Sequence, residues 1–163
     1  MNDTNMLKEI REVTALENCI IKNKEVIPTI AKEIKEFNPK NFMIVARGTS
    51  THGGIFGKYF LELHYKKPVE MADPSIFTVY DSNLAYTFAI TNNPDSLVAK
   101  ATDKHIYNEI GEVTAGAATK GYTTTLYILT KLALCLSEEE DSFDDAKYIE
   151  AVIILHLIIV LLL

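Results

Sequence analysis

The chain has 163 residues, of which 48% are hydrophobic and 23% are charged, and its formal net charge is −6. This size and composition suit one globular domain with a sizeable core, and the negative charge argues against a nucleic-acid partner because such a surface repels phosphate backbones. The two cysteines, Cys19 and Cys135, have no Cys or His close to them in the sequence. This excludes a disulfide framework and a zinc-binding pattern, and we expect both thiols to be reduced and buried.

The first forty residues have the spacing of two helices. Residues 1–8 lack the apolar core of a signal peptide, so we expect a cytoplasmic protein. Apolar residues then recur at helical intervals from Leu7 to Ile21, until Asn23 interrupts the pattern. Pro28 suits the first turn of a second helix, and Asn38-Pro39 ends that helix.

Strands and helices alternate in the middle of the chain. Three short runs predict parallel strands that lie next to one another in one sheet: Phe42–Ala46, Tyr86–Ile90 and His105–Tyr107. The segments between them predict a helix up to Lys66, an extended segment from Pro68 to Met71, a short helix from Asp73 to Tyr80, and another short helix over Ser96–Ala101. This alternation indicates a layered α/β fold with a parallel sheet.

A long apolar helix and a second apolar run close the chain. The helix is predicted over Thr119–Leu136, and the acidic stretch Glu138–Asp145 after it is expected to be solvated. The final run, Ala151–Leu163, is shorter than the roughly 18 residues that a membrane span needs. Three interpretations of this run remain open: a buried or partner-contacting element, a frameshifted end, and a membrane contact. We expect the first and do not expect a membrane partner.

The segment from Val45 to Gly54 carries the clearest chemical signal. A strand ends there, Gly48 lets the backbone turn tightly, and the hydroxyl groups of Thr49 and Ser50 precede a helix. Unbonded N–H groups at a helix start favour an anion, and open α/β sheets bind ligands at the carboxyl ends of their strands. An ordinary capped helix, in which a hydroxyl only bonds the first turn, is the alternative interpretation.

This segment, Ala46-Arg47-Gly48-Thr49-Ser50 with Gly57-Lys58-Tyr59 and Glu62 after it, resembles the first loop and helix of sugar isomerase (SIS) domains. The resemblance is to the isomerase domain of glutamine–fructose-6-phosphate aminotransferase and its amino-sugar relatives. Three further blocks resemble that family in the same order along the chain. They are Pro74-Ser75-Ile76-Phe77, then Ala89-Ile90-Thr91-Asn92 with Asp95-Ser96-Leu97, then Glu112 with Ala117–Thr123.

The resemblance implies a fold, a ligand and a site. The fold is a three-layer α/β/α sandwich of the flavodoxin-like type around a parallel sheet, and the ligand is a sugar phosphate such as fructose 6-phosphate or glucosamine 6-phosphate. The implied substrate-binding residues are Gly48, Thr49, Ser50, Gly116, Ala118 and Thr119, with Glu112, Lys120 and His52 as further candidates. The family has Ser where this chain has Ala118. The resemblance implies no cofactor and no metal, and it does not identify a catalytic residue.

The chain also departs from the family. The second phosphate loop, Ser-Gln-Ser-Gly, is missing between Leu84 and Ala85, together with one βα unit of about 30 residues. Three causes of this gap remain open: residues left out of the chain, a true deletion, and a mis-assembled reading frame. The family's second SIS domain, which supplies the proton-transferring residues, is absent from this sequence.

These observations lead to a domain division and three hypotheses about function. We expect N-terminal helices over residues 1–40, a partial SIS domain over residues 41–136, and an acidic linker with the apolar tail over residues 137–163. The chain is a fragment of an amino-sugar-phosphate isomerase or aminotransferase, a non-catalytic phosphosugar sensor, or an inactive remnant. We also expect homo-oligomers, because apolar surface on Thr119–Leu136 and on the tail would otherwise stay uncovered.

Overall fold

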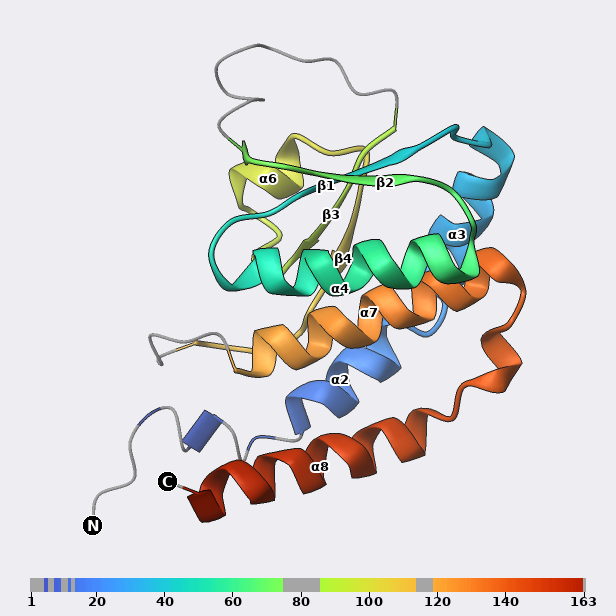
Figure 1. Cartoon of the computed structure of the whole chain (residues 1–163). Coiled ribbons are helices and arrows are strands. Elements are labelled where there is room, and N and C mark those ends of the chain that lie inside the picture. Colours follow the sequence, from blue (N-terminus) through green and yellow to red (C-terminus); the bar gives the residue numbers. More distant parts are fainter. Residues whose placement is uncertain are drawn as a thin grey trace.

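The structure is a computed structural model of the whole chain (Figure 1). It describes Asn5, Lys8, Glu9 and Glu12, and then residues 14–74, 86–113 and 119–162. The predicted short helix from Asp73 to Tyr80 and the predicted junction between Leu84 and Ala85 therefore lie largely or wholly outside the described residues.

Four short strands form two parallel pairs. Strand β1 (Phe42–Val45) pairs with β2 (Val69–Ala72), with Phe42 opposite Val69, and β3 (Phe88–Thr91) pairs with β4 (Lys104–Tyr107), with Phe88 opposite Lys104. Helix α4 (Thr49–His64) joins β1 to β2 and packs on both strands, as in a βαβ unit. The prediction of an α/β fold with parallel strands is confirmed.

The prediction of which strands lie next to one another is only partly correct. The second and third predicted strands, β3 and β4, are parallel neighbours as expected. The first, β1, is hydrogen-bonded to β2 and not to β3, so the described residues contain two separate two-stranded sheets. The physical reason is that β2 comes directly after α4 and takes one edge of β1. Among the described residues, no strand bridges the other edge of β1 to β3.

The helices end close to where the sequence predicted. Helix α2 spans Thr14–Asn23, α3 spans Val26–Phe37, and α6 spans Leu97–Lys100. Asn38 ends α3 in a left-handed conformation with φ of 50°, and its N–H donates to the carbonyl of Ile34. Ser96 caps α6 by accepting a hydrogen bond from the N–H of Ala99 at 3.2 Å.

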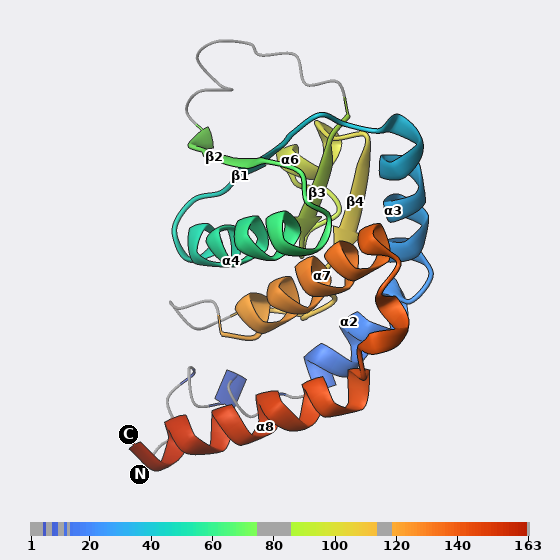
Figure 2. The same ribbon diagram turned by 45° about the vertical axis from the view of Figure 1, so that its right-hand side comes forward.

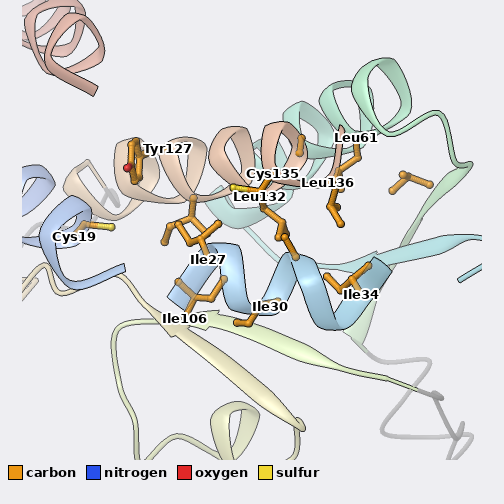
Figure 3. Close-up of a cluster of buried hydrophobic side chains, with 14 of the residues drawn as sticks. Cys19, Ile27, Ile30, Ile34, Leu61, Ile106, Tyr127, Leu132, Cys135 and Leu136 are labelled. Atoms are coloured by element: carbon orange, nitrogen blue, oxygen red, sulfur yellow. The ribbon is translucent and has the colours of Figure 1, made fainter. Parts of the chain in front are cut away.

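Helix α7 (Lys120–Ser137) is the centre of the core. Twelve of its 18 residues are buried. It packs against α2, α3 and α4 (Figures 1 and 2), and Figure 3 shows Leu132 and Leu136 on the side of α7 that faces α3. The expectation that apolar surface on Thr119–Leu136 stays uncovered is therefore wrong, because three helices cover it within the chain.

The cysteines lie inside this core. Cys19 and Cys135 are both buried, as predicted. Burial raises the pKa of the Cys19 thiol to about 12, against a weaker opposing effect of the hydrogen bond from Asn23. A thiol with that pKa is neutral at physiological pH and acts as a small apolar side chain.

Close helix packing depends on a glycine in α4. A Cβ atom at Gly57 would lie 2.8 Å from a methyl carbon of Leu129 on α7, which is closer than atoms can approach without a shift. The absence of a side chain at this position lets α4 lie directly on α7. The start of α4 and the start of α7 are thereby held beside each other (Figure 1).

The apolar tail is part of a longer helix. Helix α8 begins at Asp145, the last residue of the predicted acidic stretch, and ends at Leu162, so it starts six residues before the apolar run. Its first turns are tied to α7: the hydroxyl of Tyr127 donates to Asp145 at 3.2 Å, and the hydroxyl of Tyr148 donates to the carbonyl of Thr123 at 3.0 Å. Val152 is buried and Ile154 is exposed. No described helix combines the length and the apolar character needed to cross a bilayer.

The position of Leu132 predicts a large loss of stability on truncation. Leu132 has no exposed surface, so Leu132→Ala should lower the free energy of unfolding by about 2–5 kcal/mol through lost burial and a new cavity. Urea denaturation followed by circular dichroism measures this change. Ile21→Ala on α2 is the control, because Ile21 is 71% exposed and its truncation should cost less than about 0.5 kcal/mol. Equal effects of the two substitutions would contradict the placement of α7 in the core.

Candidate ligand pocket

A pocket of about 260 Å³ opens where β1, β3 and β4 end and α4 and α7 begin. Its residues come from the first turns of α4, from the end of β3 and the residue after it, from the residue after β4, and from the first turns of α7. They are Thr49, Ser50, Gly53, Ile90, Thr91, Asn92, Asn108, Gly121, Tyr122 and Thr125. The carboxyl ends of parallel strands are the usual ligand position in open α/β folds.

One wall of the pocket is the N-terminus of α4. Gly48 precedes this helix with φ of 63° and ψ of −135°, and no side chain caps the helix start. Thr49 and Ser50 line the pocket from the first turn. Gly53 lies opposite Thr125 of α7, since a Cβ atom at Gly53 would meet the Thr125 methyl group at 3.4 Å, an ordinary van der Waals contact. The first turn of this 16-residue helix presents hydroxyl and N–H groups beside the pocket.

Asparagines that follow β3 and β4 form another wall of the pocket. The amide of Asn92 is satisfied within the protein: its Nδ2 donates to the carbonyl of Gly111 at 2.7 Å, and its Oδ1 accepts from the N–H of Ile110 at 3.1 Å. Asn108 joins strand and helix, because its backbone N–H donates to the carbonyl of Thr91 at 3.1 Å and its Nδ2 lies 3.4 Å from the carbonyl oxygen of Gly121.

The lining of the pocket is uncharged. None of its ten residues is acidic, basic or histidine. An anion there would be held by N–H and O–H dipoles rather than by a cation. The described residues contain no cluster of His, Cys, Asp or Glu that could hold a metal ion.

The structure brings only part of the predicted site to this pocket. Thr49 and Ser50 line it, and Gly48 lies directly before them. His52, Glu112, Thr119 and Lys120 are not among the lining residues. Gly116 and Ala118 lie outside the described residues. The binding role of these residues stays a prediction.

Thr119 and Lys120 have structural partners instead. The hydroxyl of Thr119 donates to Glu9 at 3.1 Å, and the Nζ of Lys120 lies 2.6 Å from Glu12 Oε2. Lys120 is only 5% exposed, so its charge requires this carboxylate nearby. The two contacts fasten the N-terminal segment to the start of α7.

Lys58 and Glu62, which carried part of the family resemblance, also have a structural role. Lys58 Nζ lies 2.6 Å from Glu62 Oε1 and donates to the carbonyl of Val69, while the N–H of Val69 donates to Glu62 at 3.1 Å. Hydrogen bonds from Lys58 and then from Val69 hold the pKa of Glu62 below its ordinary value. This pair fixes the start of β2 against α4, and neither side chain lines the pocket.

Most of the other lining residues of the pocket were not predicted from the sequence. Asn108 comes directly after a correctly predicted strand, and the rule that ligands bind at the carboxyl ends of parallel strands could have identified it. Tyr122 and Thr125 offer no such signal, because only the packing of α7 against α4 brings them to the pocket.

Over most of its length the chain is similar to enzymes named glutamine–fructose-6-phosphate aminotransferase. No family model matches this chain. The enzyme named so in Bacteroides thetaiotaomicron is 29% identical over 184 residues, which cover 90% of this chain and 30% of the relative. The one in Thermococcus kodakarensis is 30% identical over 164 residues, which cover 82% of this chain and 27% of the relative. The chain thus spans about 30% of the length of these relatives. Both alignments are longer than the whole chain, so the relatives have residues within the matched region that this chain lacks.

Solved structures show the same fold. A protein assigned as a phosphosugar isomerase from Silicibacter pomeroyi superposes with a TM-score of 0.83 at 22% identity, over 93% of this chain and 56% of that one. The C-terminal domain of glucosamine-fructose-6-phosphate aminotransferase from Francisella tularensis superposes with a TM-score of 0.72 at 24% identity, over 93% of this chain and 52% of that domain. The chain is a sugar isomerase (SIS) domain protein that resembles the isomerase domain of glutamine–fructose-6-phosphate aminotransferase.

Proposed function

We propose that this chain binds a sugar phosphate, such as fructose 6-phosphate or glucosamine 6-phosphate, in the pocket at the start of α4. The observation that carries the proposal is the position of Thr49 and Ser50, which line a pocket at the carboxyl end of β1. The phosphate would accept hydrogen bonds from their hydroxyl groups and from N–H groups at the helix start. The rest of the lining is uncharged and mostly polar, which suits sugar hydroxyl groups.

We infer that binding is weak and that the chain alone does not turn over substrate. Isomerisation moves protons, and none of the lining residues is an acid, a histidine or a lysine. The phosphate loop that the family places after its next strand is also missing from the sequence. Each charge-assisted hydrogen bond contributes about 1.5–3 kcal/mol to the free energy of binding. Without the two or three such bonds that the missing loop would supply, we expect a dissociation constant on the order of millimolar.

The missing βα unit has a natural place in the fold. Strands β1 and β3 are not hydrogen-bonded to each other, and the relatives have additional residues within the matched region. A strand between β1 and β3 would join the two pairs into one five-stranded parallel sheet. We propose that the deletion falls between β2 and β3, in the part of the chain where the sequence departs from the family, and that residues 41–136 form the partial SIS domain of a cytoplasmic protein.

Simple assays distinguish ligand binding without catalysis from two other possibilities, an active enzyme fragment and an inactive remnant. A fragment that retains enzyme activity would form product from fructose 6-phosphate. A phosphosugar sensor would bind the ligand without product, and an inactive remnant would do neither. Isothermal titration and a product assay on the same sample distinguish the three, and we expect binding without product.

Replacing Ser50 tests the site. Ser50→Ala removes one of the few phosphate donors, which corresponds to a loss of roughly tenfold or more and should abolish millimolar binding of fructose 6-phosphate. Isothermal titration measures the affinity. Thr51→Ala is the matched control, because Thr51 lies next to Ser50 in the same helix turn but does not line the pocket. Binding by Ser50→Ala equal to that of the parent would show that the site is wrongly assigned.

We also propose that the chain forms homo-oligomers through α4. Ile55, Tyr59 and Leu63 are 41%, 67% and 68% exposed, and their spacing of four residues places them on one face of the helix. Light scattering across a wide concentration range should show a mass above 18.3 kDa that falls on dilution. Tyr59→Lys should shift the equilibrium towards monomer, because it places a charge in the proposed contact. A monomer at every concentration would contradict self-association.

A further inference from the structure

Asn108 has an unsatisfied polar atom in the wall of the pocket. The residue is 6% exposed and lines the pocket from the end of β4. Its Oδ1 is buried and has no hydrogen-bond partner among the described residues. A buried acceptor without a donor costs about 1–3 kcal/mol, so a donor is expected when the site is in use.

The neighbours of Asn108 fix the orientation of its amide. Nδ2 lies 3.4 Å from the carbonyl oxygen of Gly121 and 3.3 Å from Thr125 Oγ1. The Thr125 hydroxyl donates its proton to the same Gly121 carbonyl at 2.7 Å, so towards Asn108 it can only accept. Both neighbours of Nδ2 are thus acceptors. A flipped amide would place oxygen against oxygen, so the amide atom that lacks a partner is the oxygen.

The two walls of the pocket therefore have opposite hydrogen-bonding character. The wall at the start of α4 offers donors, namely the hydroxyl and N–H groups of Thr49 and Ser50. The wall at the end of β4 contains Asn108, whose Oδ1 is an acceptor without a partner among the described residues. Inorganic phosphate needs donors, whereas a sugar hydroxyl can donate to an amide oxygen. A ligand with an anionic group at one end and hydroxyl groups at the other satisfies both walls.

We propose that Asn108 is a specificity-determining residue whose Oδ1 accepts a hydrogen bond from a hydroxyl group of the bound sugar. This inference rests on the proposed function, because it assumes that the phosphate group lies at the start of α4. Asn108 then discriminates between a sugar phosphate and inorganic phosphate, which share the anionic group and differ in the hydroxyl groups. Asn92, whose amide is satisfied within the protein, has no such role.

The experiment compares two probes on three proteins. Fructose 6-phosphate and inorganic phosphate are titrated into the parent chain, Asn108→Ala and Asn93→Ala, and binding is followed by two-dimensional ¹⁵N–¹H NMR. Asn93 is the matched control, because its Oδ1 is already satisfied by the N–H of Asp95 and it does not line the pocket. Asn108→Ala should weaken fructose 6-phosphate about tenfold and change phosphate binding less than about twofold, and Asn93→Ala should bind both probes as the parent does.

A second readout uses the parent protein and does not depend on the folding of the variant. With ¹⁵N-labelled asparagine, the side-chain amide signal of Asn108 should shift on addition of fructose 6-phosphate and stay in place on addition of phosphate. Equal weakening of both probes by Asn108→Ala, or equal shifts with both probes, would show a structural role only and overturn the inference. Binding of neither probe by the parent would instead overturn the proposed function on which it rests.

Discussion

The burial of helix α7 is the constraint on which the rest of this molecule depends. The helix contacts α2, α3 and α4 and is tied to α8 through the hydroxyl groups of Tyr127 and Tyr148. A helix covered on several sides must be apolar almost all round, and twelve of its 18 residues are buried. The threonines near its start are compatible with that burial because their hydroxyl groups donate to carbonyls of the preceding turn, as Thr124 does to Lys120 at 3.0 Å.

This helix also explains how two separate strand pairs can form one core. Strands β1 and β2 are covered by α4, and α4 packs on α7 across Gly57. Ile106 of β4 belongs to the same buried cluster as Leu132 of α7 and Ile27 of α3. The strand pairs are therefore positioned by their helices rather than by hydrogen bonds to each other. The pocket lies where the strands end and where α4 and α7 begin, so its shape depends on how these two helices pack.

Charge is used for structure in this chain, and the pocket is left neutral. Lys58 and Glu62 fasten the start of β2, and Lys120 pairs with Glu12 at the start of α7. Glu33 accepts from Tyr86 at 2.7 Å and pairs with Lys104 at 2.9 Å, and hydrogen bonds from Lys104 and then Tyr86 hold the pKa of Glu33 below its ordinary value. Lysines whose charge is already paired with a carboxylate are poorly placed to hold a ligand as well. The polar groups that a ligand in the pocket meets are hydroxyl, amide and backbone groups, and none of the lining side chains is a carboxylate, a lysine, an arginine or a histidine.

The sequence by itself determined the elements of this fold and the loop that begins the candidate site. Apolar periodicity, Asn38 and Ser96 located α3, α6 and α7 to within a few residues, because helix ends depend on local backbone conformation and capping. The strand, glycine and hydroxyl pattern located Thr49 and Ser50 for the same local reason.

Only the tertiary structure decided which strands pair, which lysines are structural and which side chains close the pocket. Strand β1 pairs with β2 and not with β3 because the chain returns to the edge of β1 after α4. The sequence of a short apolar strand does not indicate which other strand lies beside it. The partners of Lys120 and Thr119 lie more than a hundred residues earlier in the chain. Asn108, Tyr122 and Thr125 come together with Ser50 because α7 packs on α4, and contacts between distant segments arise from the geometry of that packing rather than from the local pattern.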